Sequence, residues 1–374
     1  MSFNLIRNAR VFFTTNVGAT TGIVASTGFT ASNTQEIQVL DGLSFSQNTT
    51  TETVTLNEAG ASPVRGQRQF NTALDPVEFS MTTYMRPADT GTNISAEESV
   101  LWNAMFAADA IGGTNPAWAA GVSSATCVAT NSNLHQLQKF GLIIVLDGTA
   151  FVIDDCVMNT ATIDFGLDAI ANIQWAGNGK ALRQITSPTI GSGTLSGSLT
   201  GNFTAKITTA PFIANKLSTV TLDAGLGVGG TAYTLALTGG SLTISNNITY
   251  LTPANLGIVN QPATYFTGTR SVTGTLNCYL RTGSSNSAGL MSALLTASST
   301  DVDPEYYLKV SIGGTGADRV EVEMPAVVLS IPAVNTEQVV STTINFTAQG
   351  SANSALDISA ANEINITYYT TNAA

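Results

Sequence analysis

The stretch VEFSMTTYMR at residues 77–86 returns about 195 residues later as VTGTLNCYLR at residues 272–281. A valine, a large apolar residue, a tyrosine and an arginine recur at the same spacing in both stretches. Apolar and polar residues alternate in each, which is typical of a β-strand with one buried face. The pair of stretches therefore indicates a β protein in which one unit occurs twice.

Three further short matches support this duplication, because they occur in the same order along the chain. The separation between matching segments falls from about 199 to about 171 residues, as loop insertions in the first copy would produce. A repeat of this length is a whole domain and not a unit of a solenoid. The matching segments are residues 43–48 with 242–247, 101–106 with 290–295, and 173–175 with 344–346.

The duplication predicts two tandem domains. The first covers residues 1–186 and the second covers residues 211–374. Residues 187–210 between them are rich in Gly, Ser and Thr and are predicted to form the connection. Polar and apolar residues also alternate in this connection, so it could equally add a strand to either domain.

Each half is predicted to consist of strands and one amphipathic helix. Ser95 and Glu98 form a capping-box pattern ahead of the first helix, and Ser287 is a weaker cap for the second. Because one amphipathic helix cannot bury its apolar face alone, each must lie against a β layer. The expected fold is mainly β, with two β-sandwich or partial-barrel domains that each carry one flanking α-helix. The predicted strands are residues 39–45, 52–56, 77–85, 140–146, 233–237, 242–244, 272–280 and 306–312.

The composition excludes several classes of protein. Hydrophobic residues make up 43% of the 374 residues, which is too many for a disordered chain. A net charge of −11 removes the basic surface on which nucleic-acid binders depend. Charged residues are only 10% of the chain, against about 25% in an average soluble domain. Such a low charge is typical of a subunit whose surface is covered in a large assembly.

No catalytic or cofactor site is predicted. His135 is the only histidine, which excludes any site built on two histidines. Asp154 and Asp155 are adjacent on a predicted strand and would point to opposite faces, so they could not share acid–base work. Cys127, Cys156 and Cys278 have no metal-ligand spacing and are expected to be buried free thiols. The first ten residues lack the apolar run of a secretion signal, and no segment is long enough to span a membrane.

Two sets of residues are candidates for contacts with other molecules. Arg86 and Arg281 hold equivalent places in the two copies. They are expected to form either a structural ion pair with a nearby carboxylate or an ion pair between subunits. Small uncharged polar residues occupy one face of two matching strands, at Ser44, Ser46, Thr243 and Ser245. This face is either a Thr-rich surface sheet or a face turned toward a channel or a neighbouring subunit.

The chain resembles the tail tube proteins of long-tailed bacteriophages. The resemblance rests on the strands before a single capped helix and on ANIQWAGNG at residues 171–179, which is similar to the last strand of tube domains. It implies rings of six domains around a central β-barrel, through which genomic DNA leaves the capsid without specific binding. Two domains per chain then imply a trimer with pseudo-sixfold symmetry.

The same resemblance implies partners and a location. The partners would be further copies of the chain, together with the tape measure, terminator, baseplate or tip and, in some tails, a sheath. The protein would be assembled in the host cytoplasm and would reside in the virion, without a membrane, a cofactor or an enzymatic role. Two alternatives stay open on the residues alone: a secreted or cell-surface tandem β-sandwich adhesin, and another virion structural protein such as a capsid component.

Overall fold

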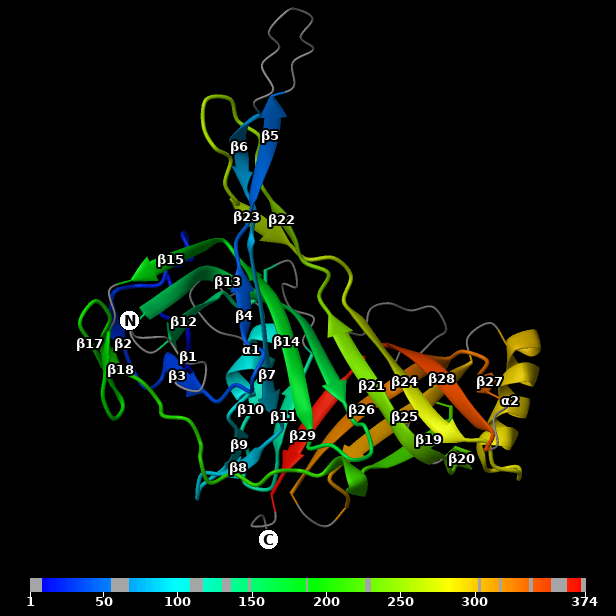
Figure 1. The fold of residues 1–374 in the computed structure, drawn as a ribbon. Coiled ribbons are helices and arrows are strands. Elements are labelled where there is room, and N and C mark those ends of the chain that lie inside the picture. The colour runs from blue at the N-terminus through cyan, green and yellow to red at the C-terminus, as the bar shows by residue number, and fades with distance from the viewer. Residues whose placement is uncertain are drawn as a thin grey trace, which may run out of the picture.

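The structure, a computed structural model, is mainly β, so the predicted fold class is confirmed. Its described residues contain two α-helices, α1 (Ser99–Phe106) and α2 (Ser287–Thr300), and one 3-10 turn, η2 (Asn215–Leu217). Figure 1 shows a broad, twisted sheet with α1 enclosed near its middle and α2 at one end. The described residues are 9–54, 67–107, 117–129, 136–146, 149–185, 188–225, 230–301, 304–315, 318–335, 339–350 and 362–370.

The first set of strands is organised around one long strand, β13 (Thr149–Asp164). The beginning of β13 pairs with β12 and β15, and the end of β13 pairs with β14. Buried and exposed residues alternate along β7 and β14, as the period of two predicts. The set runs from β1 (Ala9–Thr14) through β12 (Phe140–Leu146), β13 and β15 (Ala181–Ile185), and from the end of β13 through β14 (Asn172–Gly179) and β7 (Val77–Tyr84) to β4 (Ser44–Ser46).

The second set follows the same pairing order around β26 (Arg319–Leu329). Nearly all of β26 pairs with β25, its beginning also pairs with β29, and its end also pairs with β28. The pairing order of the first set therefore recurs in the second set. The set runs from β19 (Thr219–Ala224) through β25 (Glu305–Ile312), β26 and β29 (Asn365–Tyr369), and from the end of β26 through β28 (Ser341–Gln349) and β24 (Ser271–Tyr279) to β21 (Ala236–Ser245).

The two sets meet at a seam, which is the antiparallel pairing of β13 with β21. Thr162 lies opposite Thr243, and Ile163 lies opposite Leu242. The seam makes the sheets of the two sets continuous (Figure 1). A second link joins them, because β29 also pairs with β11 (Ala125–Val128) of the first half. A single cluster of buried apolar residues accordingly runs from Val11 to Tyr368.

The strand pairings also give the register of the repeat. With residues 77–86 and 272–281 taken as equivalent, Phe79 corresponds to Gly274. Phe79 lies opposite Phe45, and Gly274 lies opposite Leu242, so Phe45 corresponds to Leu242. The same comparison places two of the predicted matches two residues out of register, namely 43–48 with 242–247 and 173–175 with 344–346.

The predicted capping box of the first helix is wrong. Ser95 lies in the short strand β9 (Ile94–Ala96), which pairs with β8 (Pro87–Asp89), and Glu98 itself is the N-cap. The carboxylate of Glu98 accepts a hydrogen bond from the backbone N–H of Arg86 at 3.0 Å, so it stabilises a strand end and does not cap the helix. The predicted apolar face is confirmed: Leu101, Trp102, Met105 and Phe106 are all fully buried.

The second helix differs from the first in its burial. Its N-cap is Asn286, and the predicted cap Ser287 is its first helical residue. Leu290 and Leu294 are buried as expected, whereas Leu295 is half exposed. The end of the molecule that carries α2 therefore leaves apolar surface uncovered among the described residues.

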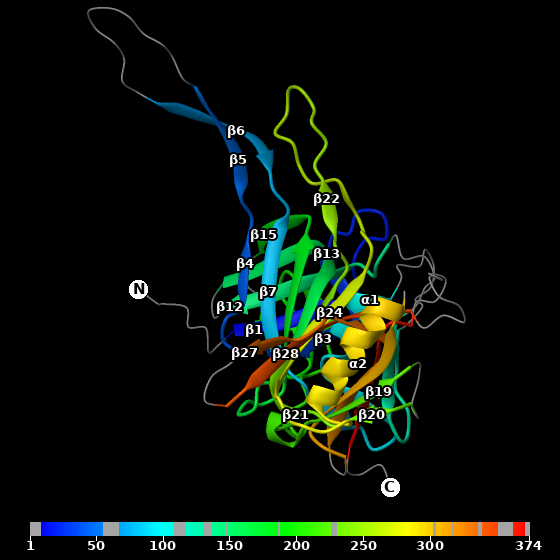
Figure 2. The same cartoon turned by 90° about the vertical axis from the view of Figure 1, so that its right-hand side faces the viewer.

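The remaining elements lie around the two sets. The predicted connection contains three short strands that pair with one another and with β2, as its alternating residues allowed. Two hairpins project together from one side of the sheet, β5–β6 and β22–β23 (Figure 2). The bounds are β2 (Thr27–Phe29), β3 (Thr34–Ile37), β5 (Thr49–Val54), β6 (Arg68–Leu74), β10 (Trp118–Ala119), β16 (Thr189–Ile190), β17 (Thr194–Ser196), β18 (Thr200–Asn202), β20 (Ala232–Tyr233), β22 (Thr249–Leu251), β23 (Thr264–Phe266) and β27 (Ala333–Asn335).

Candidate functional site

The candidate site is the polar face of the continuous sheet formed by β4, β7, β14, β13, β21, β24 and β28. Directly opposite residues of an antiparallel pair share a face, so the pairings define rows across this surface. Every member of the central row carries a hydroxyl or an amide group, and the row crosses the seam without a break. That row is Thr82, Gln174, Thr162, Thr243, Thr273 and Thr347.

Neighbouring hydroxyl groups on this face bind one another across the strands. The hydroxyl oxygens of Thr162 and Thr243 are 3.2 Å apart at the seam. Ser241 and Thr275 form a similar pair at 3.2 Å, and the Thr343 hydroxyl donates to the Asn277 side chain at 3.0 Å. Such cross-strand pairs hold the polar side chains in place on the sheet surface.

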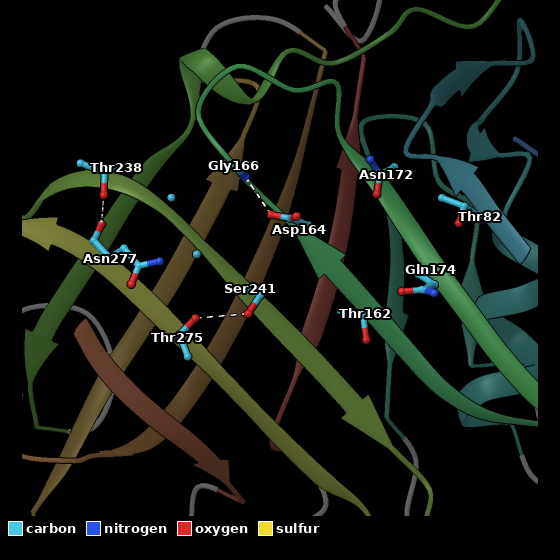
Figure 3. A pocket seen from close by; sticks show the side chains of 12 residues that line it. Thr82, Thr162, Asp164, Gly166, Asn172, Gln174, Thr238, Ser241, Thr275 and Asn277 are labelled. Carbon is cyan, nitrogen blue, oxygen red and sulfur yellow. Dashed lines mark hydrogen bonds between the residues drawn. The ribbon is translucent and has the colours of Figure 1, made fainter. Parts of the chain in front are cut away.

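The face is hollowed at the seam. An open hollow of about 610 Å³ lies over the end of β13 and the beginnings of β14 and β21. Figure 3 shows side chains from both sets around it, including Asp164, whose carboxylate accepts the N–H of Gly166 at 3.0 Å. Hydroxyl, amide and backbone groups make up the rest of its lining, so the hollow offers no cationic group to an anion. The remaining lining residues are Thr82, Thr162, Asn172, Gln174, Thr238, Gly239, Gly240, Ser241, Thr275 and Asn277.

The electrostatic character of the face follows from its composition. No lysine or arginine occurs in β4, β7, β13, β14, β21, β24 or β28. The exposed charges on these strands are the carboxylates of Glu78 and Asp164. An anionic polymer that passes this surface meets neutral dipoles and a few like charges, and none of the ion pairs that hold phosphates.

The four residues predicted to face a channel or a subunit all lie on this face. Ser44 and Ser46 are exposed on β4, where the Ser44 hydroxyl is 2.8 Å from that of Ser80. Thr243 and Ser245 are half-buried on β21, beside the seam. Strand β4 is an edge strand of the described sheet, and it pairs with β7 alone.

The two predicted arginines have different surroundings. Arg86 is buried, and its guanidinium donates to the carbonyl oxygen of Ala210 at 2.6 Å and to the Gln38 side chain at 2.8 Å. It therefore holds the connection between the two sets against the first set. Arg281 is exposed at the end of β24. Its backbone N–H donates to the Ser287 hydroxyl at 2.8 Å, just as that of Arg86 donates to Glu98.

The remaining residues singled out in the sequence are the adjacent carboxylates, the cysteines and the histidine. Asp154 pairs with Arg183 at 2.6 Å, and Asp155 lies 3.6 Å from Lys139, so the two carboxylates serve separate ion pairs. The three cysteines are free and buried, as predicted. His135 lies outside the described residues. Within the described ranges no cluster of three potential metal ligands is found, and none of the helices there is long and apolar enough to cross a membrane.

A buried acid lies behind the polar face, at the start of α1. Glu98 is 1% exposed, and burial raises the pKa of its carboxyl to about 8, although the N–H groups of Glu98 and Arg86 partly offset this rise. The hydroxyl of Tyr368 on β29 lies beside it and accepts the indole N–H of Trp102 at 2.8 Å. This group of residues connects α1 of the first half to the last strand of the second.

The raised pKa of Glu98 predicts a fall in stability as the pH rises. A group whose folded pKa exceeds its unfolded value stabilises the fold fully below the unfolded pKa, and this contribution is lost as the pH rises through the folded pKa. We expect Glu98→Gln to flatten the decline in melting temperature between about pH 5 and about pH 8.5. Glu78→Gln, at an exposed carboxyl, is the control and should keep the wild-type profile. Equal profiles for wild type and Glu98→Gln would contradict this assignment.

Comparison with known proteins identifies the family. No protein-family model matches the chain. Over 363 residues, however, the chain is 31% identical to a phage tail tube protein. The matched region makes up 93% of this chain and 73% of the relative. The chain therefore belongs to the tail tube proteins of long-tailed bacteriophages and is a component of the virion. The relative is tail tube protein pb6 of Escherichia phage T5.

Proposed function

We propose that three copies of this chain close into a ring and that the rings stack into a tube that conducts the genomic DNA during ejection. The membership of the tail tube family supports the tube. The two sets of strands per chain support the number three, because the resemblance implies six domains in each ring. The observation that carries the proposal is the seam of β13 with β21, which continues the polar face from one set to the next.

The seam within the chain serves as the template for the contact between chains. In the seam, Ile163 lies opposite Leu242. Val334 on β27 is the counterpart of Ile163. Each of these residues is third in a row of directly opposite residues that starts at equivalent positions of β7 and β24, Thr83 and Cys278. The two rows run Ile163–Ile173–Thr83 and Val334–Thr342–Cys278.

The counterpart of the seam then pairs β27 of one chain with β4 of the next. Val334 would lie opposite Phe45 of the neighbour, since Phe45 corresponds to Leu242. All three residues of β27 are exposed in the single chain, and Val334 is 37% exposed where Ile163 is 1% exposed. An uncovered strand edge with apolar residues is a liability in a free protein, and pairing around a ring removes it.

The polar face would line the channel of this ring. Strong binding of DNA requires lysine or arginine at the phosphates, and each such contact would retard the moving polymer. The lysine- and arginine-free strands described above supply hydroxyl and amide groups with a few carboxylates in their place. The role is structural, without a catalytic step or a cofactor.

The two projecting hairpins suit contact with the next ring. They leave the same side of the sheet (Figure 2), and they brace each other through a bond from the N–H of Leu74 to the carbonyl of Asn260 at 2.8 Å. Every residue of β5 is exposed. We assign these hairpins to the stacking of rings, and other tail proteins to the ends of the tube, with assembly in the host cytoplasm.

The ring is tested by blocking its edge. We expect the wild-type protein to form trimeric rings or open-ended tubes in negative-stain micrographs. Val334→Asp should leave the chain folded, because the side chain is exposed there, yet abolish rings, because closure would bury an unpaired carboxylate. Val122→Asp, at a side chain that is 74% exposed outside this edge, is the matched control. Stable wild-type monomers at every salt concentration, or rings of the Val334→Asp protein, would contradict the proposal.

A further inference from the structure

The segment 212–215, which directly follows the connection, docks on the end of the first set and shows how this end is covered. The guanidinium of Arg86 lies over the ring of Phe212, with the carbon Cζ 4.5 Å from the ring centroid. Tyr84 packs edge-on against the same phenylalanine ring, with ring centroids 5.1 Å apart. One aromatic side chain, Phe212, thus contacts a tyrosine and an arginine at the end of β7.

Backbone hydrogen bonds fix the same segment. The N–H of Ala171 donates to the carbonyl of Ile213 at 2.9 Å, and the N–H of Asn215 donates to that of Ala169 at 3.0 Å. Between these bonds, Ile170 and Ala214 lie directly opposite each other as an antiparallel bridge. The pattern is that of a non-hydrogen-bonded pair, in which the two side chains are close together.

Among the described residues, the corresponding surface of the second set has no such cover. Tyr279 and Arg281 are the counterparts of Tyr84 and Arg86. In both sets the arginine N–H donates to a side chain at the start of the helix, Glu98 in the first set and Ser287 in the second. Val339 is the counterpart of Ile170. In the single chain Tyr279 is 45% exposed, Val339 is 63% exposed, and Arg281 is exposed as well.

The register of the repeat identifies the segment that would cover this surface. Strands β12 and β25 each have a bulge at the same place, which aligns Ile144 with Val310. Val11 lies opposite Ile144, and Val220 lies opposite Val310, so Val11 corresponds to Val220. Counting back from these two valines places Phe3 at the position of Phe212 and Leu5 at that of Ala214.

The covering segment must come from a second copy of the chain. Strand β1, which follows Phe3 and Leu5, lies at one end of the molecule, whereas β27 and the end of β24 lie at the other (Figure 1). In the proposed ring, the start of one chain follows the end of its neighbour, as the start of the second set follows the first set within the chain.

We propose that residues 3–6 of one chain dock on Tyr279, Arg281 and Val339 of the neighbouring chain. This inference rests on the proposed ring and adds to it a second contact outside the sheet. Phe3 would contact both the tyrosine and the arginine, as Phe212 does, and Leu5 would lie opposite Val339, as Ala214 lies opposite Ile170. Asn4 stands where the buried Ile213 is found, so Phe3 and the backbone bonds supply most of the contact.

A disulfide pair tests the contact. Side chains of a non-hydrogen-bonded pair, with Cα atoms about 4.5 Å apart, are within reach of a disulfide. We expect Leu5→Cys combined with Val339→Cys to yield covalent trimers on non-reducing denaturing gels, and monomers after reduction. Each single variant should remain monomeric, because the three native cysteines are buried. Ile170→Cys combined with Ala214→Cys is the matched control, and it should form its disulfide within one chain.

The outcomes separate this inference from the ring itself. Intact rings in micrographs together with monomers alone on the gel would overturn the docking and leave the ring standing, provided that the control pair oxidises. Absence of rings from the wild-type protein would overturn the ring, and the docking would fall with it. Covalent trimers would support both.

Discussion

Tubes of the protein with Thr162→Arg and Thr273→Arg are expected to retain duplex DNA that wild-type tubes release. Both threonines lie in the central row of the polar face, on β13 and β24. Three chains would place six guanidinium groups around each ring, where they can bind phosphates. For six to ten phosphate contacts, affinity falls by about 10³ to 10⁵ between 50 and 200 mM salt, so the retention should be steeply salt-dependent.

Fluorescence anisotropy of a short labelled duplex measures this retention at several salt concentrations. Thr162→Gln with Thr273→Gln enlarges the same side chains without charge, and it should leave the duplex free at low salt. Micrographs must show that all three proteins form tubes. Tight, salt-sensitive binding by the wild-type tube would contradict the assignment of this face to the channel, as would arginine tubes that fail to bind.

Truncation of Trp102 should produce the largest loss of stability. Its ring is fully buried on α1, 4.7 Å from Trp175 in an edge-on contact, and its indole donates to the Tyr368 hydroxyl at 2.8 Å. Removing a buried tryptophan side chain costs about 3–5 kcal/mol. We therefore expect Trp102→Ala to lower the free energy of unfolding by about that amount in denaturant titrations.

The loss should also be uneven across the molecule. Trp102 contacts β29, which pairs with both β11 and β26, so hydrogen exchange should accelerate first at the amides of β11 and β29. Trp102→Phe keeps most of the ring and removes the indole N–H, so its cost should lie between that of Trp102→Ala and the wild-type protein. A cost for Trp102→Ala below about 1 kcal/mol would contradict the central place of this side chain.

The sequence predicts the composition of each strand better than its register. Residues of one face recur every second position, so a shift by two keeps every side chain on its own face and every pattern intact. For this reason the match of residues 43–48 with 242–247 has the correct faces and is two residues out of register. The ladder of Phe45 opposite Phe79 and Leu242 opposite Gly274 corrects it, because pairing partners distinguish positions that patterns do not.

The partners of single side chains are harder still to predict. The sequence singles out Arg86, yet its guanidinium binds the backbone carbonyl of Ala210, and every residue type carries such a group. Glu98 has the residue type of a capping box but binds a strand end. The polar face, by contrast, was predictable from Ser44, Ser46, Thr243 and Ser245, because the absence of charge is a property of the sequence itself.

The pairing of β11 with β29 has a consequence for synthesis of the chain. Cys127 of β11 lies opposite Ile366 of β29, so an edge made early by the ribosome waits for one of the last strands to emerge. Such a distant pairing forms slowly, because a long loop must close first. Until β29 arrives, Trp102 also lacks its tyrosine partner. Until then β11 keeps an unpaired strand edge, and such an edge makes an incompletely folded chain prone to aggregation.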